Sequence, residues 1–142
     1  PLTSNVVTPN LDTRGAGSFL LNGWALPEPF GTWSLGRFAE IGFHAPGMDG
    51  GTLRLNLQPL IPPNGAQQVS VSVNGEPVAD WTFTTGGFQD LEIALPTPLD
   101  DDIVVTFEIA RPIRPFDMGG SGDTRELGIA LARFELVPPP SP

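Results

Sequence analysis

The stretch that decides the fold is VSVSVNGEPVADWTF at residues 69–83. Apolar and polar residues alternate on both sides of Asn74-Gly75, which is the period of a β-strand. Asn-Gly between two such runs is the strongest short signal for a hairpin, because both turn positions favour a positive φ. Pro77 indicates a slightly longer turn or an edge strand, since proline cannot donate to a ladder. Trp81 lies on the alternating apolar face and is predicted to belong to the core.

The same alternation recurs along most of the chain, separated by clusters of Gly, Pro and Asp. No apolar stripe with a period of 3.6 residues is long enough for a stable helix. About eight short strands with long end loops predict an all-β fold, an antiparallel β-sandwich of the jelly-roll type. The further predicted strands cover residues 18–22, 37–44, 52–58, 91–95, 103–109 and 127–136.

Length and composition fit one domain: the chain has 142 residues, of which 17 are Gly, 17 are Pro and 39% are hydrophobic. We assign residues 1–136 to the β-sandwich. The proline-rich segment 137–142 is predicted to be a linker stub, as expected of a domain taken from a longer chain. No apolar run approaches the length of a membrane span, and no signal peptide stands at the N-terminus, although one could have been removed.

Charge and residue types exclude several kinds of function. All seven basic residues are Arg, against 16 carboxylates, and a net charge of −9 argues against binding nucleic acid. The absence of Cys excludes disulfides, thiolate metal sites and a cysteine nucleophile. With His44 as the single histidine, no site can use two imidazoles.

Two segments concentrate polar and aromatic residues. In the first, GWALPEPFGTWS at 23–34, Glu28 is held between two prolines and is flanked by Trp24, Phe30 and Trp33. The second, RPIRPFDMGGSGDTR at 111–125, is a glycine-rich loop before the last predicted strand. It brings a hydroxyl, a carboxylate and two guanidinium groups close together in the sequence: Ser121, Asp123, Arg114 and Arg125.

Together these segments resemble a bacterial β-sandwich accessory domain that is attached to glycosyltransferases and other envelope-polysaccharide proteins and is similar to carbohydrate-binding modules. The patterns GWxxPExxGxWS at 23–34, VxVNG at 71–75 and GxSxDxRxLGI at 119–129 carry the resemblance, which covers about residues 20–136. It implies a non-catalytic jelly roll. The matching positions are Trp24, Glu28, Trp33, Asp123 and Arg125, with Phe30 where a Trp is usual.

The residue types themselves favour sugar binding. Pyranose rings stack their C–H faces on aromatic rings, and their hydroxyls pair with carboxylates and guanidinium groups. Trp24, Phe30 and Trp33 could form the stacking platform, while Glu28, Arg114, Ser121, Asp123 and Arg125 could contact hydroxyls. Structural interpretations stand beside this one: the two Trp residues could be core or loop anchors, and Glu28 with Arg125 could be a salt bridge that ties the loops together.

Catalysis is not expected. Glu28 and Asp123 could be assigned as the two carboxylates of a glycosidase, but nothing in their spacing demands it. Ser121 does not stand in the Gly-x-Ser-x-Gly motif of a serine hydrolase nucleophile. No cofactor is expected either. A structural calcium stays open, since Asp100–Asp102 and Asp117 with Asp123 supply oxygens, although neither set has the EF-hand spacing.

We therefore predict a non-catalytic carbohydrate-binding module that recognises a poly- or oligosaccharide and targets or orients an attached polysaccharide-active enzyme. The alternative is a structural or protein-docking accessory domain without sugar affinity. The expected partners are a glycan and the attached catalytic domain, with no nucleic acid and no membrane span. The expected location is outside the cytoplasm, associated with a bacterial cell envelope.

Overall fold

The hairpin predicted at residues 69–83 forms as expected. Strands β4 (Gln67–Val73) and β5 (Glu76–Phe83) pair in antiparallel register around Asn74 and Gly75, whose φ angles are 50° and 87°. Both turn residues therefore adopt the left-handed region that a two-residue hairpin turn requires. Pro77 lies on β5, an edge strand of its sheet, next to a register shift in β4. An edge strand tolerates the missing backbone donor of a proline.

A computed structural model describes residues 21–25, 32–63, 65–119 and 121–140. Its strands join almost entirely through turns and loops, and the described residues contain one short helix. The remaining elements are β1 (Thr32–Leu35), β2 (Phe38–His44), β3 (Thr52–Pro59), β6 (Gln89–Ala94), β7 (Asp102–Ile109), α1 (Pro115–Met118) and β8 (Leu127–Val137).

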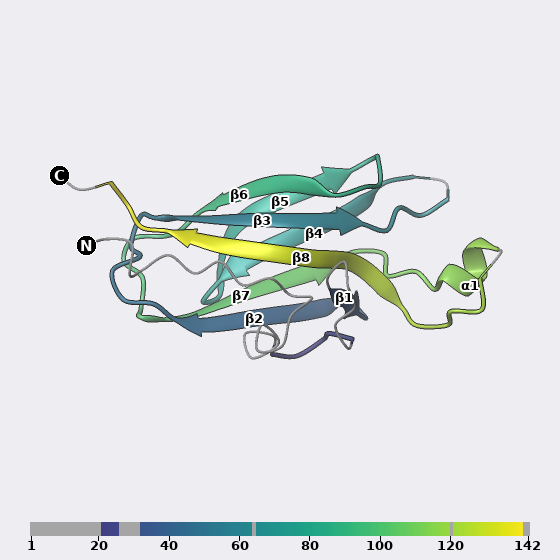
Figure 1. Ribbon diagram of the computed structural model, residues 1–142, viewed down its shortest axis with the longest axis horizontal. Coiled ribbons are helices and arrows are strands. Elements are labelled where there is room, and N and C mark those ends of the chain that lie inside the picture. The colour runs from purple at the N-terminus through teal and green to yellow at the C-terminus, as the bar shows by residue number, and fades with distance from the viewer. Residues whose placement is uncertain (1–20, 26–31, 64, 120, 141–142) are drawn as a thin grey trace.

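The eight strands form two four-stranded antiparallel sheets, with the orders β1-β8-β3-β6 and β2-β7-β4-β5. In Figure 1 the sheet containing β8, β3 and β6 lies in front of the sheet containing β7, β4 and β5. In each sheet a late strand inserts between two early ones, β8 between β1 and β3 and β7 between β2 and β4. These two sheets confirm the predicted all-β antiparallel sandwich, and the jelly-roll type stays a prediction.

The core lies between the sheets because every second side chain of each central strand points inward. In β3 the side chains of Leu53, Leu55 and Leu57 are all buried, and Arg54, which lies between them, points outward. Rings from both sheets pack together, as in the stacked pair Phe43–Phe134 with centroids 5.6 Å apart. Burial of this apolar surface is the main force that holds the two sheets together.

Trp81 packs against this core from the edge strand β5, with its ring centroid 5.9 Å from that of Phe83. It is half-buried, because an edge strand covers only one side of the ring. The prediction that Trp81 belongs to the core is therefore confirmed in part: Trp81 packs against the core but is not fully buried.

Only the end of the strand predicted at residues 18–22 lies within the described residues. Leu21 and Asn22 lie outside the strands, and residues 18–20 lie outside the described part of the chain. The first described strand, β1 at Thr32–Leu35, begins within the first polar and aromatic segment (residues 23–34), where no strand was predicted. β1 has only four residues and pairs with β8 across a register shift, so its alternation is too short to stand out in the sequence.

Candidate functional site

The second predicted segment forms a loop at one end of the sandwich, which we call the tip loop (residues 114–126). Its base is closed by reciprocal backbone hydrogen bonds between Ile113 and Leu127, each 2.8 Å long. Figure 1 shows α1 and the surrounding chain projecting beyond the ends of the strands. Four of the predicted site residues lie in this loop: Arg114, Ser121, Asp123 and Arg125.

The charged residues of the tip loop pair with one another. Arg125 donates to both carboxylate oxygens of Asp123, from Nε to Oδ1 at 3.0 Å and from a terminal nitrogen to Oδ2 at 2.7 Å. The hydrogen bonds from the Arg125 side chain and backbone lower the pKa of Asp123 to about 2. Arg114 pairs in the same bidentate way with Asp117, whose hydrogen bond raises the pKa of Arg114.

Backbone contacts complete this bracing. The Ser121 hydroxyl accepts a hydrogen bond from the Asp123 backbone N–H at 3.1 Å. The Phe116 N–H donates to the Asp123 carbonyl at 2.7 Å. These bonds brace the described residues of the tip loop, among which Phe116 and Met118 are 56% and 40% exposed. Phe116 was not predicted as a platform, because the sequence motifs contain the Trp residues and leave Phe116 out.

The Trp residues of the first segment lie against the sandwich. Trp24 is half-buried and meets Phe107 edge-on, with ring centroids 6.2 Å apart, and its Nε1 donates to the Glu40 carbonyl at 2.7 Å. These contacts favour the interpretation of Trp24 as an anchor. Trp33 is half-buried on β1, where it is opposite Ala130 of β8. Glu28 and Phe30 lie outside the described residues, so their predicted roles stay predictions.

The two segments meet where β1 ends. Leu35 is opposite Leu127 in the ladder with β8, and the Gly36 N–H donates to the Glu126 carbonyl at 2.8 Å. The fold thus brings the chain just after the first segment to the base of the tip loop, and a sugar site formed by the two segments stays a prediction.

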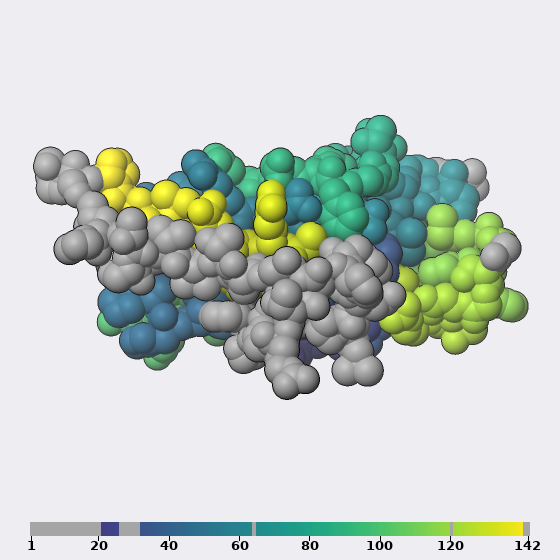
Figure 2. Space-filling model, viewed as in Figure 1, coloured from purple at the N-terminus to yellow at the C-terminus, as the bar shows by residue number. Residues whose placement is uncertain are grey.

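A hollow lies elsewhere, on the outer face of the sheet formed by β8, β3 and β6. We call it the sheet groove; its volume is about 510 Å³. Figure 2 shows side chains of β8 (yellow), β3 (blue) and β6 (green) reaching the surface on this face. The groove is lined by Arg54, Leu55, Asn56, Asp90, Leu91, Glu92, Arg133, Phe134 and Glu135.

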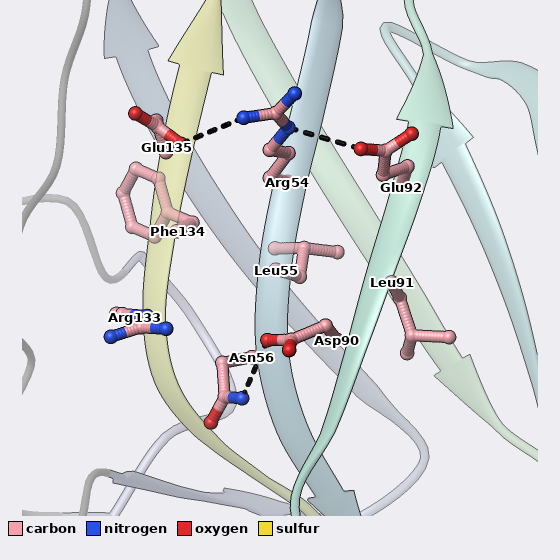
Figure 3. A pocket seen from close by; sticks show the side chains of 9 residues that line it. All are labelled: Arg54, Leu55, Asn56, Asp90, Leu91, Glu92, Arg133, Phe134 and Glu135. Atoms are coloured by element: carbon pink, nitrogen blue, oxygen red, sulfur yellow. Dashed lines mark hydrogen bonds and ion pairs between the residues drawn. The ribbon is translucent and has the colours of Figure 1, made fainter.

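The polar side chains of the sheet groove form two rows that cross the strands (Figure 3). In the first row Arg54 of β3 lies between two carboxylates. It reaches Glu92 of β6 at 3.0 Å and Glu135 of β8 at 3.6 Å. The register makes this possible, since Arg54 is opposite both residues in the two ladders.

The second row contains Arg133, Asn56 and Asp90. The Asn56 amide donates to Asp90 at 2.8 Å, and Asn56 is opposite Arg133 in the ladder with β8. Within the described part of the chain, no ion pair or side-chain hydrogen bond engages Arg133. In Figure 3, Leu55 lies along β3 between the two rows.

Sequence reasoning missed the sheet groove entirely. The sequence signal for the groove lies in the polar residues that alternate with apolar ones, as in Leu-Arg-Leu-Asn-Leu at 53–57 and Arg-Phe-Glu at 133–135. Alternation places these polar residues on the outer face of their own strand. It does not say which three strands are neighbours, and that knowledge is needed to assemble the rows.

Other kinds of site receive no support from the described residues. They contain no group of three His, Asp or Glu side chains that could hold a metal ion. None of their helices is long and apolar enough to cross a membrane. Asp102 belongs to the acidic run 100–102 and lies at the start of β7. Its Oδ1 is 2.7 Å from His44 Nδ1, which is within hydrogen-bond distance.

No protein-family profile matches the chain, and no curated protein matches it either. Solved structures do resemble it in fold. The CBM36-1 domain of a multidomain xylanase from the hindgut metagenome of Trinervitermes trinervoides has a TM-score of 0.52 and 13% identity, and the match covers 96% of this chain and 100% of that domain. At this identity the likeness shows a shared β-sandwich and nothing finer.

Two larger proteins contain a similar unit. The acetyl xylan esterase Est2A from the rumen bacterium Butyrivibrio proteoclasticus matches with a TM-score of 0.58 and 12% identity, over 96% of this chain and 34% of its own. Latent PorU from Porphyromonas gingivalis matches with a TM-score of 0.58 and 10% identity, over 93% of this chain and 12% of its own. The chain thus spans about a third and about an eighth of these two proteins.

Proposed function

We propose that the chain is a non-catalytic carbohydrate-binding module and that it holds a glycan in the sheet groove. The observation that carries this proposal is the pair of polar rows across β8, β3 and β6. Carboxylates, guanidinium groups and an amide are the partners that sugar hydroxyls use, since each hydroxyl both donates and accepts. The fold of a carbohydrate-binding module, shared over the full length of the CBM36-1 domain, supports it.

The exposure of the rows supports the same proposal. The side chains of Arg54 and Glu92 are 56% and 63% exposed, and ion pairs in such positions contribute little to stability. The contribution to folding stability is therefore only a weak explanation for a guanidinium group aligned between two carboxylates on a concave surface. Ligand binding gives a stronger one, because the pairs hold hydrogen-bonding groups in fixed positions before the ligand arrives.

The module is proposed to act as part of a larger protein. The similar units in the acetyl xylan esterase and in PorU make up only a fraction of those chains. We propose that this domain likewise orients an attached catalytic domain on a polysaccharide, outside the cytoplasm of a bacterium. The tip loop, with the predicted residues Arg114, Ser121, Asp123 and Arg125, is a second candidate surface for the glycan.

Three variants test the assignment of the glycan site to the sheet groove, and each removes one exposed Arg from an ion pair. Arg54→Ala alters the sheet groove, Arg125→Ala alters the tip loop, and Arg37→Ala is the control, because Arg37 pairs with Glu108 on the opposite sheet at 3.5 Å. Binding is measured by affinity gel electrophoresis and calorimetry on a panel of soluble polysaccharides, with and without calcium. Thermal melts verify that each variant is folded.

We expect micromolar to millimolar dissociation constants for the wild-type domain, as open hydrogen-bonding sites give. Arg54→Ala should weaken binding about 3- to 10-fold, the net worth of one ordinary hydrogen bond, and Arg37→Ala should leave it unchanged. A loss confined to Arg125→Ala would move the site to the tip loop. A folded domain that binds no glycan would favour the docking module instead, with Phe116 and Met118 as its exposed apolar contact.

A further inference from the structure

The sheet groove offers a ligand almost no aromatic surface. Phe134, the one aromatic residue that lines it, is 1% exposed, and Leu55 is 2% exposed. Leu91 is half-buried. A ligand in the groove therefore meets polar side-chain atoms together with aliphatic carbon, and it finds no exposed aromatic ring on which to stack.

This lack of a platform bears on the physical form of the ligand. A crystalline polysaccharide presents flat faces on which most hydroxyls are already paired within the crystal, so these faces offer a protein mainly C–H surface. A concave, polar groove without exposed rings cannot match such a face. It matches a single hydrated chain, whose hydroxyls exchange water for the side chains of the rows.

Charge bears on the chemical class of the ligand. The groove holds three carboxylates and two guanidinium groups, and Arg54 is neutralised by Glu92 and Glu135. Of the two guanidinium groups in the groove, Arg133 is the one with no acidic partner among the described residues. Because the chain as a whole carries a net charge of −9, a polyanionic glycan would be repelled over its length.

The spacing of the rows fits one sugar chain. Rows formed by residues i and i+2 of a strand lie about 7 Å apart. A ring between them can reach Arg54 on one side and Asn56 on the other. Arg54 donates, Asp90 and Glu92 accept, and Asn56 can do both, which suits neighbouring hydroxyls on one ring.

From these observations we infer that the sheet groove selects neutral, soluble, single-chain polysaccharides and discriminates against both polyanionic glycans and crystalline surfaces. The inference rests on the proposed function and adds the ligand class. Recognition is by hydroxyl hydrogen bonds to the two rows, with Arg133 acting as a hydrogen-bond donor and not as the partner of an anionic group.

The test compares three forms of one polysaccharide, cellulose, and a set of unrelated glycans. The intact domain is run against neutral hydroxyethylcellulose, anionic carboxymethylcellulose and insoluble microcrystalline cellulose. The same measurement uses arabinoxylan, galactomannan and mixed-linkage glucan as neutral probes, with polygalacturonate and alginate as anionic ones. Each bound probe is measured again at low and at high NaCl concentration.

We expect retardation by one or more neutral soluble probes, with affinity that changes less than about twofold with salt, and no retention on the crystalline solid. Tighter binding to an anionic probe, falling steeply with salt, or retention on microcrystalline cellulose would overturn the inference while leaving the proposed function standing. A folded domain that binds no probe at all overturns the proposed function and the inference with it.

A conservative pair of variants tests the role of Arg133. Arg133→Gln keeps a hydrogen-bond donor and loses the charge, and Arg133→Ala loses both. For a neutral ligand, Arg133→Gln should stay within about threefold of the wild type while Arg133→Ala falls further. If Gln and Ala weaken binding equally, by tenfold or more, Arg133 recognises an anion and the inference is wrong.

Discussion

At the scale of single residues, Gln67 is notable because its buried side-chain amide depends on several hydrogen bonds to the backbone. Its side chain is fully buried at the start of β4 and bonds three backbone groups from two other segments. Nε2 donates to the carbonyls of Leu60 at 3.1 Å and Arg111 at 2.6 Å, and Oε1 accepts from the Arg111 N–H at 2.9 Å. Gln67 thereby ties the loop after β3 to the chain that leads into the tip loop.

Gln67→Ala should lower the free energy of unfolding by about 2–3 kcal/mol, because it leaves a small cavity and removes three hydrogen bonds at once. Gln68→Ala is the matched control, since the neighbouring Gln68 is exposed and its substitution should cost less than about 0.5 kcal/mol. Urea denaturation of both variants measures the difference. Equal midpoints for the two would show that Gln67 does not hold these segments.

The candidate site shows what a sequence can predict at this scale. The residues of the tip loop are neighbours in the chain, so their proximity was predictable, and Asp123 and Arg125 do pair. The first row of the sheet groove was not predictable, because Arg54, Glu92 and Glu135 come from three strands separated by long stretches of chain. Their alignment depends on the register of two ladders, which the intervening turns and crossovers determine together.

At the scale of elements, Gly128 of β8 allows the two sheets to approach. A Cβ atom at this position would lie 2.5 Å and 2.8 Å from two side-chain carbons of Ile109, and 3.0 Å from the Ser34 Oγ. The Ser34 hydroxyl is itself buried and accepts the Ile129 N–H at 2.9 Å. The absence of a side chain at Gly128 is therefore part of how β8 packs against β1 and β7.

Gly128→Ala should destabilise the domain by about 1–3 kcal/mol, the usual cost of forcing an extra carbon into a packed core. Gly122→Ala is the control, because a Cβ atom there would meet nothing within 4 Å. Thermal melts of the two variants check the expectation. If Gly128→Ala melts with the wild type, the sheets have room that the structure does not show.

Most strands were predictable because their alternation is long and their turns are chemically distinct. The hairpin at Asn74-Gly75 forms as its turn residues require. β1 was missed for a physical reason as well: it is short, it follows a segment rich in Pro and Gly, and its pairing with β8 supplies most of its order. Strands of this kind are defined by their neighbours more than by their own sequence.

At the scale of the whole molecule, the carboxylates determine how stability responds to pH. The chain carries a net charge of −9, so protonation of carboxylates relieves repulsion as the pH falls. The hydrogen bond with Asp102 raises the pKa of His44 above 6.5. The stabilisation from that pair is complete below the unfolded pKa and is lost as the pH rises through the folded one.

Asp123 acts in the opposite direction. Its pKa is lowered from 3.8 to about 2 by hydrogen bonds from Arg125, so its contribution is complete above pH 3.8 and is lost as the pH falls towards 2. The melting temperature should therefore rise from pH 8 to about pH 5–6 and fall again below about pH 4. Thermal melts between pH 2 and pH 8 measure this profile.

Two variants separate the limbs of that profile. Asp102→Asn should flatten the change between pH 6 and 8, and Asp123→Asn should flatten the acid limb, since each removes the carboxylate whose pairing creates the slope. Because His44 is the single histidine, its NMR titration is unambiguous, and Asp102→Asn should return its pKa to about 6.5. A wild-type His44 that titrates at or below 6.5 would contradict the Asp102 pairing, and the neutral limb would then reflect net charge alone.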